Sequence, residues 1–288
     1  MEPINKTTAR EKWKSYKKHP LSLVLFLLVA GAAVVTVGIL LFLIAYILMK
    51  GIPHLRLSLF AWEYNSENVS MLPAIVNTVL MTALSLLLAV PVGLFSAIYL
   101  TEYAGSRNRL VAVVRITAET LSGIPSIVYG LFGYLVFFLA CGFGYSLLGG
   151  ALTLAIMILP LIMRTTEEAL KAVPATYREG SYGLGARKLR TIFRIVLPSA
   201  MPGILSGVVL GIGRIVGETA ALIYTAGTLP EICDSLLDSG ATLSVHMYAL
   251  LSEGFYTDEA YATAVVLLVL VIAINAAAGC LAKKIATR

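Results

Sequence analysis

Six long runs of apolar residues divide the 288-residue sequence, and they constrain the fold more than any other feature. Each run has about 17 to 30 residues, the length of an α-helix that crosses a hydrocarbon layer about 30 Å thick. Hydrophobic residues make up 58% of the chain and charged residues only 13%, so it is more apolar than a soluble domain of this length can bury. We therefore predict an all-α integral membrane protein with six transmembrane helices at residues 21–49, 71–100, 122–140, 147–163, 203–227 and 261–282.

The first apolar run differs from the other five. It lacks proline and is much longer than the roughly 7 to 15 apolar residues at the centre of a signal peptide. We expect it to remain in place as an anchor helix, followed by a polar outer segment at residues 50–70. The other five runs, within residues 71–282, carry proline and glycine interruptions, which are typical of a transporter core.

Lys and Arg are distributed unequally between the two sides of this predicted topology. Of 22 such residues, 19 fall on the side that holds residues 1–20, 101–121, 164–198 and 283–288, two fall on the other side, and Arg214 lies inside a span. Because cytoplasmic segments are enriched in Lys and Arg, we predict a cytoplasmic (inner) membrane protein with both termini in the cytoplasm. The opposite loop, residues 228–260, carries six acidic residues and no Lys or Arg. The net charge of +6 therefore follows from topology and gives little support to nucleic-acid binding.

The sequence has few groups of the kinds that hold metals or carry out covalent catalysis. The three histidines lie outside the predicted spans, and the three cysteines show no metal-ligand spacing. No G-x-x-x-x-G-K-[ST] motif occurs, so the chain has no P-loop for ATP. We expect a protein that is not an enzyme, with no metal site, no catalytic residue and no cofactor of its own; any ATP must be bound by a partner subunit.

The basic loop at residues 164–198 has a pattern that predicts two short helical segments. Pro174 suits the first turn of a helix, because no amide partner is needed there. Gly185 suits a helix end, where a left-handed backbone conformation is common. A second, basic segment at residues 186–194 runs on to Pro198. We predict a helix, a tight glycine bend and a second helix that project from the membrane.

This loop resembles a pattern found in permease subunits of binding-protein-dependent ABC importers: Glu-Ala-Ala, three residues, Gly, nine residues, Ile, one residue and Leu-Pro. The spacing is matched here, with Gly180 and Ser181 in place of the two alanines. The resemblance implies that the loop docks on a separate ATPase, with Glu179 and Gly185 shaping the docking helix. A plain topology signal is the alternative, since basic loops often have no other role. The positions concerned are Glu179, Gly180, Ser181, Gly185, Ile195, Leu197 and Pro198.

Arg214 lies eleven residues into the fifth predicted span, about 16 Å along a helix and so near the middle of the membrane. An arginine there costs about 2.5 to 3.5 kcal/mol, so it should face the bundle interior or a polar cavity. Its fork of donors matches phosphate oxygens, and Glu218, one helical turn further, can pair with it when substrate is absent. The Glu218 carboxylate can also accept a hydrogen bond from the P–OH of phosphate, which sulfate lacks. The alternative is a pair that only fixes helix packing.

The third predicted span opens with LSGIPSIVYGLFG, residues 121–133. Proline disfavours the helical conformation in the residue before it and is favoured in a first helical turn. A break is therefore predicted at Ile124–Pro125, with Ser126 at a helix N-terminus. Such a terminus can bind an anion, and discontinuous helices often form transport sites. An ordinary helix start at the membrane surface is the alternative.

The stretches SGIPSIVYGLFG, RIVGETAAL and ATLSVHMYALLSEG resemble permeases of the phosphate-specific importer, and the short N-terminal region is similar to that of its A-type subunit. This resemblance implies a type I ABC importer permease, in which a five-helix core at residues 71–282 forms half of a path for inorganic phosphate. It also implies a homologous second permease subunit, two ATPase subunits and an extracytoplasmic phosphate-binding protein as partners. Arg164, at the inner end of the fourth span, is then a candidate second phosphate ligand. The alternatives are a permease for molybdate or sulfate and a membrane enzyme that acts on lipid headgroups.

Overall fold

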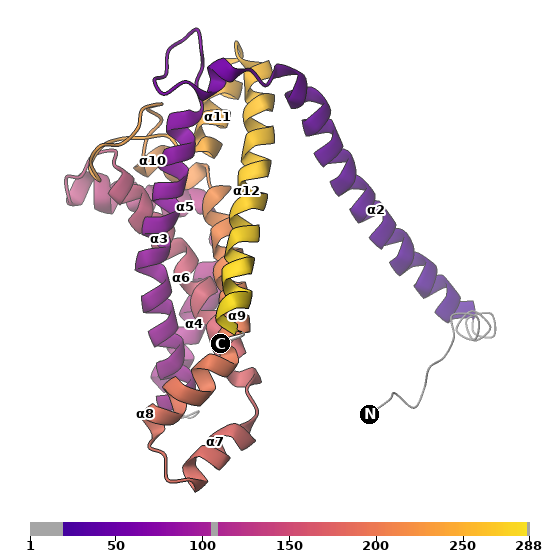
Figure 1. The fold of residues 1–288 in the computed structure, drawn as a ribbon, viewed down its shortest axis with the longest axis vertical. Helices are drawn as coiled ribbons and strands as arrows, with labels where there is room; N and C mark the ends of the chain where they lie inside the picture. Colours follow the sequence, from indigo (N-terminus) through magenta and orange to yellow (C-terminus); the bar gives the residue numbers. More distant parts are fainter. Residues whose placement is uncertain (1–19, 105–108, 287–288) are drawn as a thin grey trace. The chain divides into compact units, whose positions relative to one another are not determined.

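The computed structural model describes residues 20–104 and 109–286, and all regular elements within them are helices (Figure 1). Most of the predicted N-terminal segment and the last two residues of the tail lie outside this part. The chain divides into two units, Met1–Lys50 and Gly51–Arg288. Within the described residues, five helices are long and apolar enough to cross a membrane, and a sixth span results if one bent pair of helices counts as one.

Helix α2 (Pro20–Gly51) contains the predicted anchor. It runs for 32 residues without an internal break. Its apolar residues are spread around the whole helix, which is the pattern expected when lipid surrounds a helix on all sides. At 1.5 Å per residue, 32 residues extend for about 48 Å, more than a hydrocarbon layer requires.

The second unit is a helical bundle. In chain order its elements are η1 (Ile52–His54), η2 (Leu57–Phe60), α3 (Leu72–Ile98), η3 (Tyr99–Tyr103), α4 (Arg109–Ser122), α5 (Ser126–Gly133), η4 (Tyr134–Ala140), α6 (Leu147–Ala172), α7 (Ala175–Gly183), α8 (Lys188–Thr191), η5 (Ile192–Val196), α9 (Leu197–Val216), α10 (Ala220–Thr225), α11 (Leu243–Glu253) and α12 (Thr257–Ala286). Helices α3 and α9 both pack on α6, and α12 packs on α9 (Figure 1).

Small residues allow these helices to approach one another closely. A Cβ atom added to Gly93 of α3 would lie 2.8 Å from the side chain of Ile162 on α6. One added to Gly207 of α9 would overlap the side chain of Thr165, and one on Gly203 would lie 2.7 Å from Ala169. Because lipid is as apolar as the helices themselves, such close contact is a main source of helix association in membranes. Helix α6 is therefore held firmly on two sides.

The third predicted span, residues 122–140, is one helical segment from Ser126 on, and the break expected at Ile124–Pro125 separates it from a helix that precedes it. Two helical segments, Val111–Ser122 and Ser126–Ala140, meet there at 104°. The first of these segments lies between the predicted second and third spans, and it carries Arg115 and Glu119. In the structure both side chains line a polar cavity beside α6, so the helix can carry them.

The fifth predicted span, residues 203–227, is wrong at both ends, because the helix begins earlier and stops earlier than predicted. The helix is continuous from Lys188 to Val216 and then stops, and α10 starts only at Ala220. Similarly, α6 runs to Ala172, beyond the end at residue 163 that hydropathy indicated. Hydropathy marks where a helix becomes polar, which is not where its hydrogen bonding ends.

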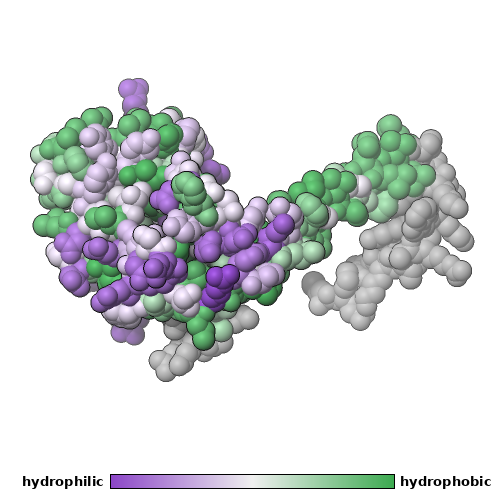
Figure 2. Space-filling view, turned by 90° about the horizontal axis from the view of Figure 1, so that it is seen from above, coloured by the Kyte–Doolittle hydropathy of each residue, from purple (hydrophilic) through white to green (hydrophobic). Residues whose placement is uncertain are grey.

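Helix α3 organises the end of the bundle that the Lys and Arg distribution predicts to face outward, called the outer end below. The Asn77 side chain is fully buried; its amide nitrogen donates to the carbonyl oxygens of Glu231 at 2.7 Å and Ala241 at 3.3 Å. The Thr78 hydroxyl accepts the amide of Leu243 at 2.8 Å and so fixes the start of α11. Viewed onto this end, hydrophilic residues cover much of the surface (Figure 2). Exposed acidic residues on the outer segment, the outer loop and the start of α12 include Glu63, Glu67, Asp234, Asp238 and Asp258.

Candidate functional site

The first helix break, between α4 and α5, follows the predicted pattern. Pro125 has an extended backbone (φ −58°, ψ 142°), and α5 begins at Ser126 directly after it. The buried Tyr129 hydroxyl donates to the carbonyl oxygen of Leu121 at 2.8 Å and ties the first turn of α5 to the last turn of α4. The predicted break at Ile124–Pro125 is confirmed.

A second helix break lies between the end of α9 at Val216 and the start of α10 at Ala220. It contains Glu218, whose side chain is largely buried. Its carboxylate oxygen Oε1 accepts the amide of Ala221 at 3.1 Å, and its main-chain carbonyl accepts the hydroxyl of Ser244 at 2.6 Å. A carboxylate is stabilising at a helix N-terminus, where amides lack partners within the helix. Glu218 therefore caps α10, a role that sequence reasoning did not find.

Arg214 lies in the last turn of α9 and is half-buried. The predicted pairing with Glu218 one turn further is wrong, because α9 ends at Val216. Among residues 20–104 and 109–286, none of the ion pairs includes Arg214. The next residue, Ile215, packs in the same buried cluster as Tyr129 of α5. A half-buried guanidinium without a carboxylate partner keeps donors that an anion can use.

The two breaks lie beside one another because α5 and α10 pack in parallel. A Cβ atom on Gly130 would lie 2.9 Å from the Cα of Ala221, and one on Gly133 would meet Thr225 further along both helices. The N-termini of α5 and α10 therefore lie at the same end of this pair of helices. The structure brings together Pro125, Ser126, Arg214 and Glu218, which are well separated in sequence.

Arg164 lies at a different level of the bundle. Its neighbour Thr165 meets Gly207 of α9, and Arg214 is seven residues further along α9, a separation of roughly 10 Å along the helix axis. Arg164 donates through Nε to Glu168 at 3.1 Å, and both side chains are mostly exposed. The structure therefore does not place Arg164 at the two breaks.

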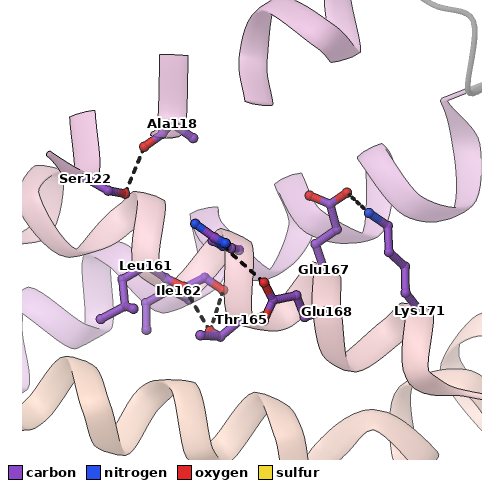
Figure 3. Close-up of polar contacts among 9 residues, drawn as sticks. Ala118, Ser122, Leu161, Ile162, Thr165, Glu167, Glu168 and Lys171 are labelled. Atoms are coloured by element: carbon purple, nitrogen blue, oxygen red, sulfur yellow. Dashed lines mark hydrogen bonds and ion pairs between the residues drawn. The ribbon is translucent and has the colours of Figure 1, made fainter. Parts of the chain in front are cut away.

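A cavity of about 180 Å³ lies between α4 and α6 beside Arg164. Glu167, of which 8% is exposed, lies 2.6 Å from both Arg115 Nη2 on α4 and Lys171 Nζ on α6. Figure 3 shows Glu167 reaching toward Lys171 and Glu168 turned the other way along the helix. Sequence reasoning missed this cluster, because its members come from two segments about fifty residues apart. The charged residues that line the cavity are Arg115, Glu119, Arg164, Glu167, Glu168 and Lys171.

The first part of the predicted cytoplasmic loop has the expected structure. Helix α7 follows Pro174, and Gly185 has a left-handed backbone with φ of +79°. Glu179 and Gly180 are exposed, whereas the Ser181 hydroxyl is buried 2.8 Å from that of Thr191. The small side chain of Ser181 is thus needed for contact between α7 and α8.

The second part of the loop differs from the expectation of a separate helix. Helix α8 continues through η5 into α9 without a break, and Pro198 lies in the first turn of α9. Ile195 and Leu197 are half-buried, and Leu184 at the bend is 92% exposed. A cavity of about 700 Å³ opens beside Gly185, lined also by Ser181, Leu184, Ala186, Arg190, Arg194 and Ile195. An exposed leucine beside a cavity with two arginines is a surface suited to a protein partner.

Comparisons with protein sequences are consistent with this arrangement. A family model described as "Binding-protein-dependent transport system inner membrane component" matches residues 89–288. The probable ABC transporter permease protein YqgI of Bacillus subtilis is 32% identical over 264 residues, which cover 85% of this chain and 90% of that protein. The phosphate transport system permease protein PstA 1 of Mycobacterium tuberculosis is 39% identical over 218 residues, covering 75% and 71%. PstA of Pasteurella multocida is 36% identical over 233 residues, covering 80% and 82%.

Solved structures share the fold at low sequence identity. A chain of a bacterial alginate ABC transporter, in complex with an alginate-bound periplasmic protein, has a TM-score of 0.69 and 17% identity, with 95% of this chain and 98% of that chain covered. A chain of the MetNI methionine ABC transporter in an inward-facing conformation has a TM-score of 0.59 and 19% identity, covering 75% and 94%. At these identities the likeness establishes the fold alone.

Proposed function

We propose that this chain, which belongs to the family of binding-protein-dependent transport system inner membrane components, forms half of the path by which an ABC importer moves inorganic phosphate into the cytoplasm. The chain is a membrane transport subunit with the helical fold of type I importer permeases. Relatives named as phosphate transport permeases, 36 to 39% identical, support phosphate as the substrate.

The unpaired guanidinium of Arg214 is the observation that carries this proposal. It is half-buried within the bundle, has no carboxylate partner among the described residues, and lies beside two helix breaks. Amides at helix N-termini and an arginine fork both favour oxyanions. We assign phosphate contact to Arg214 and to the backbone that follows Pro125, starting at Ser126.

Glu218 has a second role in this proposal. Its Oε1 atom already accepts the Ala221 amide, so the other carboxylate oxygen is the one that can accept a hydrogen bond from P–OH. Sulfate carries no proton at neutral pH and would meet only repulsion there. Glu218 would thus favour phosphate over sulfate at the membrane site as well as cap α10.

Arg164 belongs to a later point of the same path. Arg164 lines a polar cavity that is nearer than Arg214 to the loop from α7 to α8. Its ion pair with Glu168 is solvent-accessible, so an anion can easily replace the carboxylate. We propose that Arg164 meets phosphate on its way out.

The partners follow from the family and from two surfaces of the chain. The loop from α7 to α8, with exposed Glu179 and Gly180, would dock on one of two ATPase subunits that bind and hydrolyse ATP. A homologous permease would complete the path, and a phosphate-binding protein would dock at the outer end, where exposed acidic residues gather. This arrangement places both termini in the cytoplasm, in agreement with the Lys and Arg distribution.

Uptake of labelled phosphate into vesicles that carry the complete importer tests the proposal. We expect Arg214→Gln to assemble and to keep ATP hydrolysis but to lose about 100-fold or more in uptake, since a charged hydrogen bond at a desolvated site is removed. Arg214→Lys keeps the charge without the fork and should lose less. Normal uptake by Arg214→Gln would move the binding site to the partner permease.

Competition in the same vesicles separates phosphate from other oxyanions. With the wild-type chain, excess sulfate or molybdate should leave phosphate uptake nearly unchanged. Glu218→Gln retains an oxygen that can cap α10, so it should assemble and show weaker discrimination against sulfate. Uptake of sulfate or molybdate in preference to phosphate by the wild-type importer would identify a different substrate.

A further inference from the structure

Arg178 of α7 binds two other helices through its guanidinium. Nη2 and Nε donate to Glu102 Oε1 at 2.7 and 3.1 Å, Nη1 donates to the carbonyl oxygen of Val173 at 3.0 Å, and Nη2 also donates to that of Leu170 at 3.0 Å. Only 19% of the Arg178 side chain and 6% of the Glu102 side chain are exposed. This is a short, buried and fully occupied ion pair, which leaves little freedom between its two ends.

A second contact joins the same two regions. Lys188, at the start of α8, places its ammonium 4.7 Å from the centre of the Tyr103 ring. Tyr103 follows Glu102 in η3, a wide helical turn that continues α3. The segments before and after the Gly185 bend therefore both hold the inner end of α3.

The chain itself does not connect α3 to this segment. Helix α7 follows α6, and α8 leads into α9, whereas Arg178 and Glu102 are 76 residues apart. A movement of α7 reaches α6 and α9 through the backbone. Among the described residues, the Arg178–Glu102 ion pair joins α7 itself to the inner end of α3, where Ile98 and Leu100 also share a buried apolar cluster with Ile192 and Val196.

The other end of α3 holds the outer parts of the molecule. Asn77 binds the backbone of the outer loop at Glu231, and Thr78 binds the first residue of α11, Leu243. The next residue of α11, Ser244, donates to the carbonyl oxygen of Glu218 in the second break. Helix α3 thus links the segment α7–α8 at one end to the outer loop and the break at the other.

We propose that the Arg178–Glu102 ion pair is a coupling link, which makes α3 move together with α7 when a bound ATPase moves α7. This inference rests on the proposed docking of an ATPase on α7. Arg178 and Glu102 are positioning residues in this account: neither touches phosphate or ATP, and both transmit displacement.

Glu102→Gln tests the link with little disturbance, because Arg178 retains its two carbonyl acceptors and the side-chain shape is unchanged. In vesicles with the complete importer, we expect the variant to keep its ATPase subunits and about the wild-type rate of ATP hydrolysis. Phosphate uptake per ATP hydrolysed should fall by about tenfold, a typical size for the coupling between two sites. A role in stability alone would lower assembly, hydrolysis and uptake together in both Glu102→Gln and Arg178→Lys, and that result would overturn the proposal.

Matched variants define the link further. Arg178→Lys keeps the charge but offers a single point of contact, so it should lose part of the coupling and can carry the test if Glu102→Gln assembles poorly. The double change Glu102→Gln with Arg178→Lys should be no worse than the more severe single change, and additive losses would contradict the link.

A readout that needs no substrate separates this inference from phosphate transport. In the assembled wild-type complex, ATP should change the hydrogen exchange of residues 72–82 at the outer end of α3. In Glu102→Gln that change should be lost while exchange in α7 still responds. If the wild-type complex shows the response but no phosphate uptake, the proposed substrate is wrong and the link stands. If both chains respond equally, the link is wrong.

Discussion

The surroundings of Arg178 and Arg214 show two opposite uses of an arginine in one helical bundle. Arg178 makes hydrogen bonds to Glu102, Val173 and Leu170, so each face of its fork is occupied within the chain. Arg214 has no ion pair among the described residues and lies where two helices are broken. An occupied fork fixes one helix to another, whereas an unoccupied fork inside the bundle is stable only if an anion or water completes it.

The free energy of unfolding should separate these two arginines most strongly. Arg178→Gln leaves Glu102 buried without its partner, and we expect a loss of about 3 to 5 kcal/mol. Arg214→Gln removes a charge that has no carboxylate partner, so we expect little loss or a slight gain. Denaturant unfolding of the detergent-solubilised chain would measure both. Equal losses for the two variants would remove the distinction drawn here.

His246 tests whether a buried side chain with one unpartnered polar atom is always a binding group. It is 3% exposed, its Nε2 atom has no hydrogen-bond partner in the structure, and burial lowers the pKa of its imidazole to about 4. The Tyr64 ring meets it edge-on at 6.1 Å. It lies at the outer end, on α11, where apolar side chains such as Val69 and Leu250 pack nearby.

For His246 we expect a pH effect on stability and none on phosphate binding. The unfolded imidazole, with a pKa near 6.5, takes up a proton at a higher pH than the folded one. The contribution of neutral His246 to the free energy of unfolding is therefore fully present above pH 6.5, and it falls by about 3 kcal/mol as the pH is lowered to 4. His246→Phe preserves the ring and should lose this acid-side fall. Unfolding of both chains between pH 7 and pH 4 checks it; parallel curves would show that His246 does not titrate as described.

The pair Arg164–Glu168 is neither buried like Arg178–Glu102 nor unpaired like Arg214. Its loss should have the smallest effect on stability. Both side chains are mostly exposed, and exposed ion pairs contribute little to stability. Glu168→Gln should leave the melting temperature unchanged within error. A clear drop would mean that Arg164 is a structural arginine like Arg178 and would weaken its assignment to the phosphate path.

Local sequence signals predicted several parts of the molecule correctly. Pro125 and Pro174 each precede the first residue of a helix, and Gly185 adopts the left-handed conformation. These predictions succeeded because backbone restrictions at proline and glycine act within one or two residues. The helix α7 and the glycine bend after it could therefore be predicted, whereas the continuity of α8 with α9 could not.

Contacts between distant segments could not be predicted in the same way. Nothing in the apolar stretch around RIVGETAAL indicates that α9 stops at Val216, because the break is completed by Ser244, 26 residues further on. Glu218 was selected as a functional candidate because of its spacing from Arg214, whereas its role as a cap on α10 depends on that break. The cluster around Glu167 and the Arg178–Glu102 pair were missed for the same reason.

The sequence by itself determined that this is a helical membrane protein of a recognisable transporter family, with an arginine within a span. Those properties depend on composition and on short spacings, through the cost of placing charge and unpaired backbone in lipid. Only the tertiary structure decided which arginine has its donors free, since that depends on which acids lie within about 3 Å after folding. The same carboxylate and guanidinium groups become a link, a cap or a site according to how the helices pack.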